Sequence, residues 1–169
     1  MNKNIYLVGF MGAGKSAVGK ELSARTNKNF IEMDEIIEQK EGMAISDIFA
    51  KKGENYFRLR EKALLADIAK DENLIVSCGG GVVIDQDNII LLKKTGFMIW
   101  LEADIETLYR RTKSCVNRPL LDVANPEEKI RQLLKQRQAF YREAHFWLDT
   151  SHLSVDQVAD EIARKLKDD

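Results

Sequence analysis

The stretch Gly9-Phe10-Met11-Gly12-Ala13-Gly14-Lys15-Ser16 decides the fold of this 169-residue chain. It follows an apolar run at residues 5–8 that has the composition of a strand, and it precedes a segment with helical periodicity. Strand, GxxxxGK(S/T) and helix in this order are the context in which the pattern forms a phosphate-binding loop. Glycines let successive N–H groups point at phosphate oxygens, and the helix N-terminus adds a partial positive charge. The sequence therefore predicts nucleotide binding.

The chemistry of a nucleoside triphosphate assigns roles within this loop. Lys15 is expected to reach the β- and γ-phosphates as a catalytic residue, and Ser16 to place its hydroxyl on a Mg²⁺ ion that bridges the same phosphates. The residues expected to bind ATP here are Gly12, Ala13, Gly14, Lys15, Ser16 and Ala17.

Strand-like and helical segments alternate along the rest of the chain. Short apolar runs lie at residues 5–8, 30–33, 74–77, 97–101 and 146–148, and charged segments with helical periodicity separate them. Parallel strands need crossover helices and are buried on both faces. We therefore predict an α/β fold in which residues 1–169 form a single three-layer domain, with a five-stranded parallel sheet and helices on both faces.

Helix-start and helix-stop signals place several of the helices. We expect helices from Gly14 or Lys15 to about Thr26, from Ser46 to near Gly53, over 54–69, and from Pro126 to about Glu143. Periodicity is lost between Lys113 and Asn125, which makes residues 112–125 a candidate lid.

Composition limits the classes of partner. With 26 basic and 27 acidic side chains the formal charge is −1, so no overall field attracts nucleic acid or an anionic membrane. No apolar stretch approaches the roughly 20 residues of a membrane span. The two cysteines, Cys78 and Cys115, form neither a disulfide framework nor a metal-ligand spacing. We expect a cytoplasmic monomer that acts on small molecules.

Two other classes of nucleotide-binding protein fit less well. A motor ATPase usually ends a second apolar strand in Asp-Glu, but Glu32 interrupts the apolar run before Asp34-Glu35. A GTPase is expected to carry Asn-Lys-x-Asp, and the chain lacks it. Carboxylates after the second strand, a glycine turn at 79–81 and an arginine near residue 118 instead favour a small phosphotransferase with a lid.

These motifs together resemble the shikimate kinases along nearly the whole chain. Phe57-Arg58-x-x-Glu61 is similar to the family's FRxxE segment, the glycines at 79–81 to its glycine turn, and Arg118-Pro119-Leu120-Leu121 to its lid motif. Arg137 precedes Tyr141-Arg142 as the family's second substrate arginine precedes its YR pair. One departure is clear, because Glu32-Met33-Asp34 stands where the family usually has Asp-x-Asp.

The resemblance implies ATP-dependent phosphorylation of the 3-hydroxyl of shikimate with Mg²⁺, in aromatic amino-acid biosynthesis. The region 34–61 would then bind substrate. Asp34, Arg58, Gly80 and Arg137 would contact shikimate, with Asp34 also catalytic. Arg118 would act in catalysis and ATP binding, Arg111 would stack on adenine, and Glu32 would hold Mg²⁺ through water. Phe49 and Phe57 would wall the pocket.

Other interpretations of these residues remain open from the sequence itself. Asp34 suits the N-cap of a helix over 35–41 as well as a catalytic role. Arg58 and Arg137 taken singly fit solvated helix-face charges, with Glu61 able to hold Arg58 as an i,i+3 partner. A gluconate or nucleoside monophosphate kinase is a second candidate function, and a degenerate nucleotide-dependent binding protein, supported by Glu32 alone, is a third.

Overall fold

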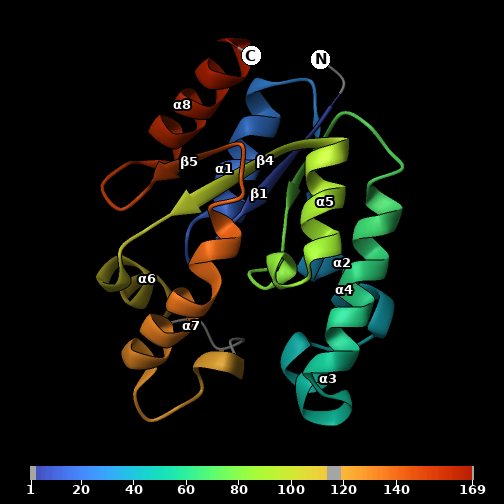
Figure 1. Ribbon diagram of the computed structural model, residues 1–169, viewed down its shortest axis with the longest axis vertical. Helices are drawn as coiled ribbons and strands as arrows, with labels where there is room; N and C mark the ends of the chain where they lie inside the picture. The colour runs from blue at the N-terminus through green and yellow to red at the C-terminus, as the bar shows by residue number, and fades with distance from the viewer. Residues whose placement is uncertain (1–2, 114–118, 169) are drawn as a thin grey trace.

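A five-stranded parallel sheet forms the centre of the computed structural model, which describes residues 3–113 and 119–168. The strands are β1 (Asn4–Val8), β2 (Asn29–Glu32), β3 (Leu74–Ser77), β4 (Gly96–Glu102) and β5 (Phe146–Asp149). Their order across the sheet is β2-β3-β1-β4-β5, and every neighbouring pair is parallel. Figure 1 shows helices packed on both sides of the strands. The predicted fold class is therefore confirmed.

The helices carry recognisable start and stop signals. They are α1 (Lys15–Arg25), α2 (Met33–Glu41), α3 (Ile45–Lys52), α4 (Glu54–Ile68), α5 (Gln86–Thr95), α6 (Ile105–Thr112), α7 (Pro126–Tyr141) and α8 (Val155–Asp168), with 3₁₀ turns η1 (Val82–Ile84) and η2 (Pro119–Leu121). The side chains of Asp85, Asp104 and Asn125 cap α5, α6 and α7 by accepting backbone N–H groups. The four helices predicted with bounds agree with the structure within a few residues.

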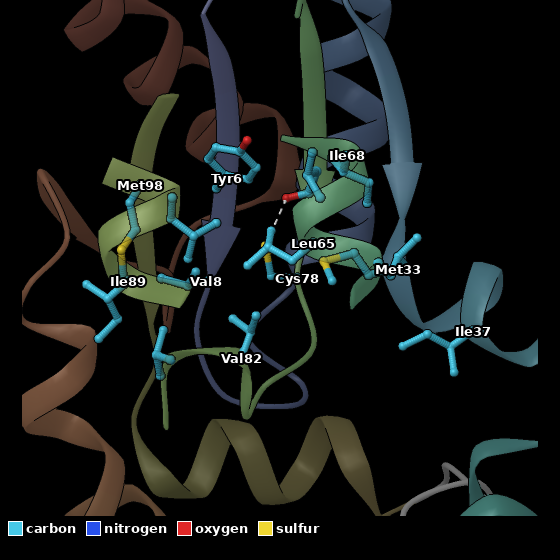
Figure 2. Close-up of a cluster of buried hydrophobic side chains, with 14 of the residues drawn as sticks. Tyr6, Val8, Met33, Ile37, Leu65, Ile68, Cys78, Val82, Ile89 and Met98 are labelled. Carbon is cyan, nitrogen blue, oxygen red and sulfur yellow. Dashed lines mark hydrogen bonds between the residues drawn. The ribbon is translucent and has the colours of Figure 1, made fainter. Parts of the chain in front are cut away.

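Each face of the sheet is covered by its own hydrophobic cluster, because alternate residues of a strand point to opposite faces. Tyr6 and Val8 of β1 join a cluster with residues of α2, α4 and α5, part of which Figure 2 shows around Leu65 and Ile68. Ile5 and Leu7 join the second cluster, with residues of α1, α6, α7 and α8. Every position of β1 is buried, the polar Asn4 included, which reflects the cover of helices on both faces of the sheet.

The strand order places the loops after β1 and β3 next to each other. These two strands are neighbours, but α1 packs on one face of the sheet and α5, which follows β3, packs on the other. Open α/β sheets bind ligands in the crevice that forms where successive helices diverge in this way, outside the carboxyl ends of the strands. The phosphate loop and the glycine turn therefore meet at the expected place for a site.

Two local expectations are wrong. Helix α2 begins at Met33, so Asp34 lies in its first turn and Glu32 occupies the N-cap position without a side-chain capping bond. The apolar run 146–148, in a sheet predicted to be buried on both faces, would place its tryptophan in the core, yet Trp147 is 58% exposed, whereas Trp100 of β4 is 4% exposed. Trp147 lies on the edge strand β5, whose alternate side chains face solvent.

Within the described part of the chain, no helix has the length and apolarity needed to cross a bilayer.

Candidate active site

The phosphate loop folds back around its own lysine. Lys15 Nζ donates hydrogen bonds to the carbonyl oxygens of Gly9 (2.9 Å) and Phe10 (3.0 Å), and the residue is 9% exposed. Gly12 and Gly14 have φ angles of 84° and 95°, which side chains disfavour. The loop and the N-terminus of α1 border a cleft of about 610 Å³. Lys15 is thus held beside a space that suits a polyphosphate.

Oxygen-bearing side chains gather at one side of this cleft. Glu32 ends β2 in register with Ser77 of β3. Burial raises the pKa of the Glu32 carboxyl, Asp34 acts in the same direction, and hydrogen bonding from Ser16 opposes the rise. Ser77 also lowers this pKa from nearby, yet Glu32 Oε2 and Ser77 Oγ are buried without a well-formed hydrogen bond among the described residues. Such oxygens fit a hydrated Mg²⁺, which binds few protein groups and keeps several waters.

Side chains leave no room for a Cβ at two of the three glycines of the turn at 79–81. A Cβ on Gly79 would overlap Glu61 Oε1 and come within 3.1 Å of Asp34 Oδ1. A Cβ on Gly81 would overlap the guanidinium of Arg58. The turn therefore packs directly against the charged groups of α2 and α4.

Arg58 is held in place by two glutamates of its own helix. Its Nη1 donates to Glu61 Oε2 at 2.8 Å and its Nη2 to Glu54 Oε1 at 3.0 Å. Glu61 is 1% exposed, and burial raises the pKa of its carboxyl while the charge of Arg58 opposes that rise. The predicted i,i+3 pair is therefore confirmed, and it fixes Arg58 against the glycine turn.

Arg137 of α7 is a nearly buried cation at 4% exposure. Its Nη1 donates a long hydrogen bond, 3.4 Å, to Gly80 O, and its guanidinium lies over the ring of Phe10. No Asp or Glu in the described parts of the chain forms a salt bridge with it. A buried charge is costly unless an opposite charge compensates it. Arg137 therefore suits an anionic ligand.

Arg58, Arg137, Asp34 and Glu61 line one cavity. Its apolar wall includes Ile45, Phe49, Phe57, Pro119 and Leu120, so the two phenylalanines lie where we expected them. The cavity shares Met11, Asp34, Ile45 and Gly80 with the cleft beside the phosphate loop, which we call the nucleotide cleft. A small anion in the cavity would thus lie next to the terminal phosphate of a nucleotide.

Arg111 of α6 also borders the nucleotide cleft. Its Nη1 donates to Gly12 O (3.3 Å), and its Nη2 donates to Thr150 O (3.0 Å). Thr150 Oγ1 in turn contacts Ala13 O and Glu102 O, at 3.3 and 3.0 Å. Arg111 is thus tied to the phosphate loop rather than solvated on a helix face. Stacking on adenine stays a prediction.

Known proteins resemble this chain over nearly its whole length. The sequence profile of the family described as shikimate kinase matches residues 11–167. A shikimate kinase of Thermoanaerobacter pseudethanolicus is 46% identical over 96% of this chain and 95% of its own length, and one of Sulfurihydrogenibium sp. is 45% identical over 98% of each. The chain belongs to the shikimate kinase family.

A solved structure extends the family match to three dimensions. The shikimate kinase from Acinetobacter baumannii in complex with shikimate superposes with a TM-score of 0.96 at 38% identity, over 99% of this chain and 94% of that one.

The structure brings together most of the residues that the shikimate kinase resemblance singled out. Lys15, Ser16, Glu32 and Arg111 border the nucleotide cleft, Arg58 and Arg137 border the smaller cavity, and Asp34 and Gly80 border both. Arg118 lies outside the described residues, although Pro119 and Leu120 of the same motif line the cavity.

Sequence reasoning gave no role to Ser77, Tyr141 or Thr150. The only sequence signal for Tyr141 was its place before Arg142 near the end of a predicted helix. The contacts of Tyr141 with Gly80 and of Thr150 with Ala13 join residues that are distant in sequence.

Proposed function

We propose that this protein transfers the γ-phosphoryl group of ATP to the 3-hydroxyl of shikimate, as a step of aromatic amino-acid biosynthesis. The guanidinium of Arg137 carries the proposal, because it is buried without a salt bridge to any described residue and so calls for an anionic acceptor beside the nucleotide cleft. Family membership and the likeness to a structure that contains shikimate support this acceptor.

On the donor side, residues 12–17 bind the phosphates through backbone N–H groups, and Lys15 contributes charge where the bond between the β- and γ-phosphates breaks. Ser16 directly, and Glu32 through water, would hold Mg²⁺, which would supply positive charge to neutralise the phosphates. Arg111 lies against the nucleotide from α6.

On the acceptor side, Arg58 and Arg137 bind the carboxylate, since a guanidinium presents a planar fork of donors that matches it. The Gly80 N–H binds an acceptor oxygen. Asp34, at the junction of the two cavities, accepts a hydrogen bond from the attacking hydroxyl, orients it and takes its proton as the new P–O bond forms.

Motion completes the proposed site. Residues 34–61 form the acceptor-binding region of the single domain 1–169, and residues 112–125 form a lid whose Arg118 stabilises charge on the transferring group and whose closure excludes water. We propose a cytoplasmic enzyme that works as a monomer, because residues of one chain supply both cavities.

An ADP-release assay tests the proposal with shikimate, gluconate and nucleoside monophosphates as acceptors. We expect Mg²⁺-dependent ADP release with shikimate and little with the others. If gluconate or a nucleotide is turned over faster than shikimate, that compound replaces shikimate as the proposed acceptor. If the protein binds ATP but releases no ADP with each of these acceptors, the third candidate, a degenerate nucleotide-dependent binding protein, is favoured.

A further inference from the structure

The three carbonyl groups of the glycine turn are held in different ways. Gly79 O accepts from the Val82 N–H at 3.1 Å, and Gly81 O accepts from the Ile84 N–H at 3.0 Å. Gly80 O instead accepts from the hydroxyl of Tyr141, at 2.5 Å, and weakly from Arg137. The central peptide of the turn therefore depends on side chains of α7, and local backbone does not fix it.

Tyr141 is built to hold this position. It is the last residue of α7, it is fully buried, and its ring stacks on Trp100 at 5.7 Å between centroids and 16° between planes. Burial raises the pKa of its phenol to about 12, so the hydroxyl stays protonated. A carbonyl oxygen only accepts, so the phenol is the donor.

Fixing the Gly80 carbonyl also fixes the direction of an N–H group. In a trans peptide the C=O of one residue and the N–H of the next point in opposite directions, so the Gly80 carbonyl sets where the Gly81 N–H points. Neither the Gly80 nor the Gly81 N–H has a hydrogen bond to another part of the described chain. Glycines give the turn no steric preference of its own, so a missing partner would let this peptide rotate.

The hydroxyl also limits what Arg137 does. Both groups approach Gly80 O, but the phenol is closer by 0.9 Å (3.4 − 2.5). Because Tyr141 satisfies this buried acceptor, the guanidinium need not turn toward it.

We propose that Tyr141 is a positioning residue for the acceptor: its hydroxyl orients the Gly80–Gly81 peptide and leaves the Arg137 guanidinium available to the acceptor's carboxylate. The role rests on the proposed function, since it concerns how that carboxylate is bound.

Tyr141→Phe tests the role, and Tyr6→Phe is its matched control. Tyr6 is also fully buried, and its hydroxyl bonds Thr95 and Asn4, away from both cavities. Tyr141→Phe should raise KM for shikimate about three- to tenfold, the effect of one buried hydrogen bond, with KM for ATP unchanged. Tyr6→Phe should lower Tm and leave both KM values as they are. An unchanged KM for shikimate in Tyr141→Phe, or equal rises in both variants, would overturn the role.

A spectroscopic readout is independent of turnover. Among the ten glycines, only 79–80 and 80–81 are joined to one another, so glycine labelled with ¹³C at the carbonyl and with ¹⁵N gives two amide–carbonyl correlations. The Gly81 correlation reports the Gly80 carbonyl carbon. It should move in Tyr141→Phe and stay in Tyr6→Phe, and an unmoved signal in Tyr141→Phe would refute the role.

The two readouts separate this role from the proposed function. If the wild-type protein phosphorylates another acceptor, the proposed function fails. The positioning role then stands if the Gly80 carbonyl signal moves and KM for that acceptor rises, and it falls if either stays unchanged.

Discussion

At the scale of single residues, burial and charge conflict most sharply at Arg137. Removing it as Arg137→Ala, or removing its neighbour as Arg58→Ala, should weaken shikimate binding by about 2–4 kcal/mol, because one side of a buried charge-assisted pair is lost. ATP affinity should barely change. Titration calorimetry with each ligand measures both effects.

Arg131→Ala is the matched control, since Arg131 lies on the same helix but is 55% exposed and pairs only loosely with Glu127 and Glu128. It should bind shikimate normally. Binding of a shikimate analogue without its carboxylate as tightly as shikimate itself would contradict the proposed clamp.

Glu32 is the residue at which the chain departs from the usual family pattern, and its raised pKa gives that difference a pH signature. A carboxyl with a raised pKa takes up its proton at a higher pH than an ordinary glutamate, whereas Mg²⁺ favours the ionised form. The Mg²⁺ concentration for half-maximal velocity should therefore rise as the pH is lowered from neutral into the mildly acidic range. Turnover measured as a function of Mg²⁺ concentration, at neutral and at mildly acidic pH, gives this dependence.

Two variants of Glu32 control for the pH dependence of ATP itself. Glu32→Ala should need more Mg²⁺ at neutral pH and lose the extra acid sensitivity, whereas Glu32→Asp should change activity only modestly, because the water around Mg²⁺ absorbs the shorter side chain. Parallel pH dependence in the wild type and Glu32→Ala would remove Glu32 from the metal site.

Sequence predicts residue roles where the signal is local. The phosphate loop and the Arg58–Glu61 pair follow from spacing alone, since three residues apart on a helix is a contact distance. Tyr141 meets Gly80 across 61 residues, and Thr150 meets Ala13 across 137. Such contacts depend on how α7 and β5 pack, which no spacing encodes.

At the scale of elements, one carboxylate joins three helices of the proposed acceptor-binding region. Glu41, at the end of α2, binds Lys52 of α3 and Tyr56 and Arg60 of α4. Hydrogen bonding to Lys52, then to Tyr56, lowers the pKa of the Glu41 carboxyl to about 2. The side chain is 5% exposed, so solvent screens the cluster only in part.

Glu41→Gln should therefore lower the Tm at neutral pH. A depressed folded-state pKa gives stability that is present above the unfolded-state pKa, about 4.3, and is lost as the pH falls toward about 2. The Tm difference between the two proteins should shrink over that interval. Glu161→Gln, which removes an exposed pair with Arg164 on α8, should cost little at any pH. A difference for Glu41→Gln that does not depend on pH would contradict the linkage.

Element types were predictable because strand and helix periodicities are local, but one boundary was not. The apolar run 30–33 reads as a strand through Met33, yet the strand ends at Glu32 and Met33 opens α2 with its side chain fully buried. A buried side chain suits either element, so tertiary packing decides the boundary.

At the scale of the whole molecule, the sequence predicts a parallel sheet but not its order. Alternating strands and helices fit several strand orders, and the order found brings the phosphate loop and the glycine turn together. Because β1 and β3 are neighbours and their following helices pack on opposite faces, a donor site and an acceptor site can lie together at the carboxyl ends of the strands. The site is thus a property of the topology as much as of its motifs.

Stability and function should oppose each other at the carboxyl ends of the strands, and replacing Arg137 should show by how much. Arg137→Met keeps much of the side chain's volume and removes a buried charge that forms no salt bridge with a described residue, so the ligand-free protein should have a higher Tm than the wild type. Shikimate at one hundred times its Kd should stabilise the wild type by about 2.7 kcal/mol, or roughly 5–10 °C for a chain of this size. The same concentration should shift Arg137→Met far less. Thermal unfolding with and without shikimate gives all four values. A lower Tm for ligand-free Arg137→Met together with a full shikimate shift would mean that Arg137 supports the fold and leaves the acceptor to other groups.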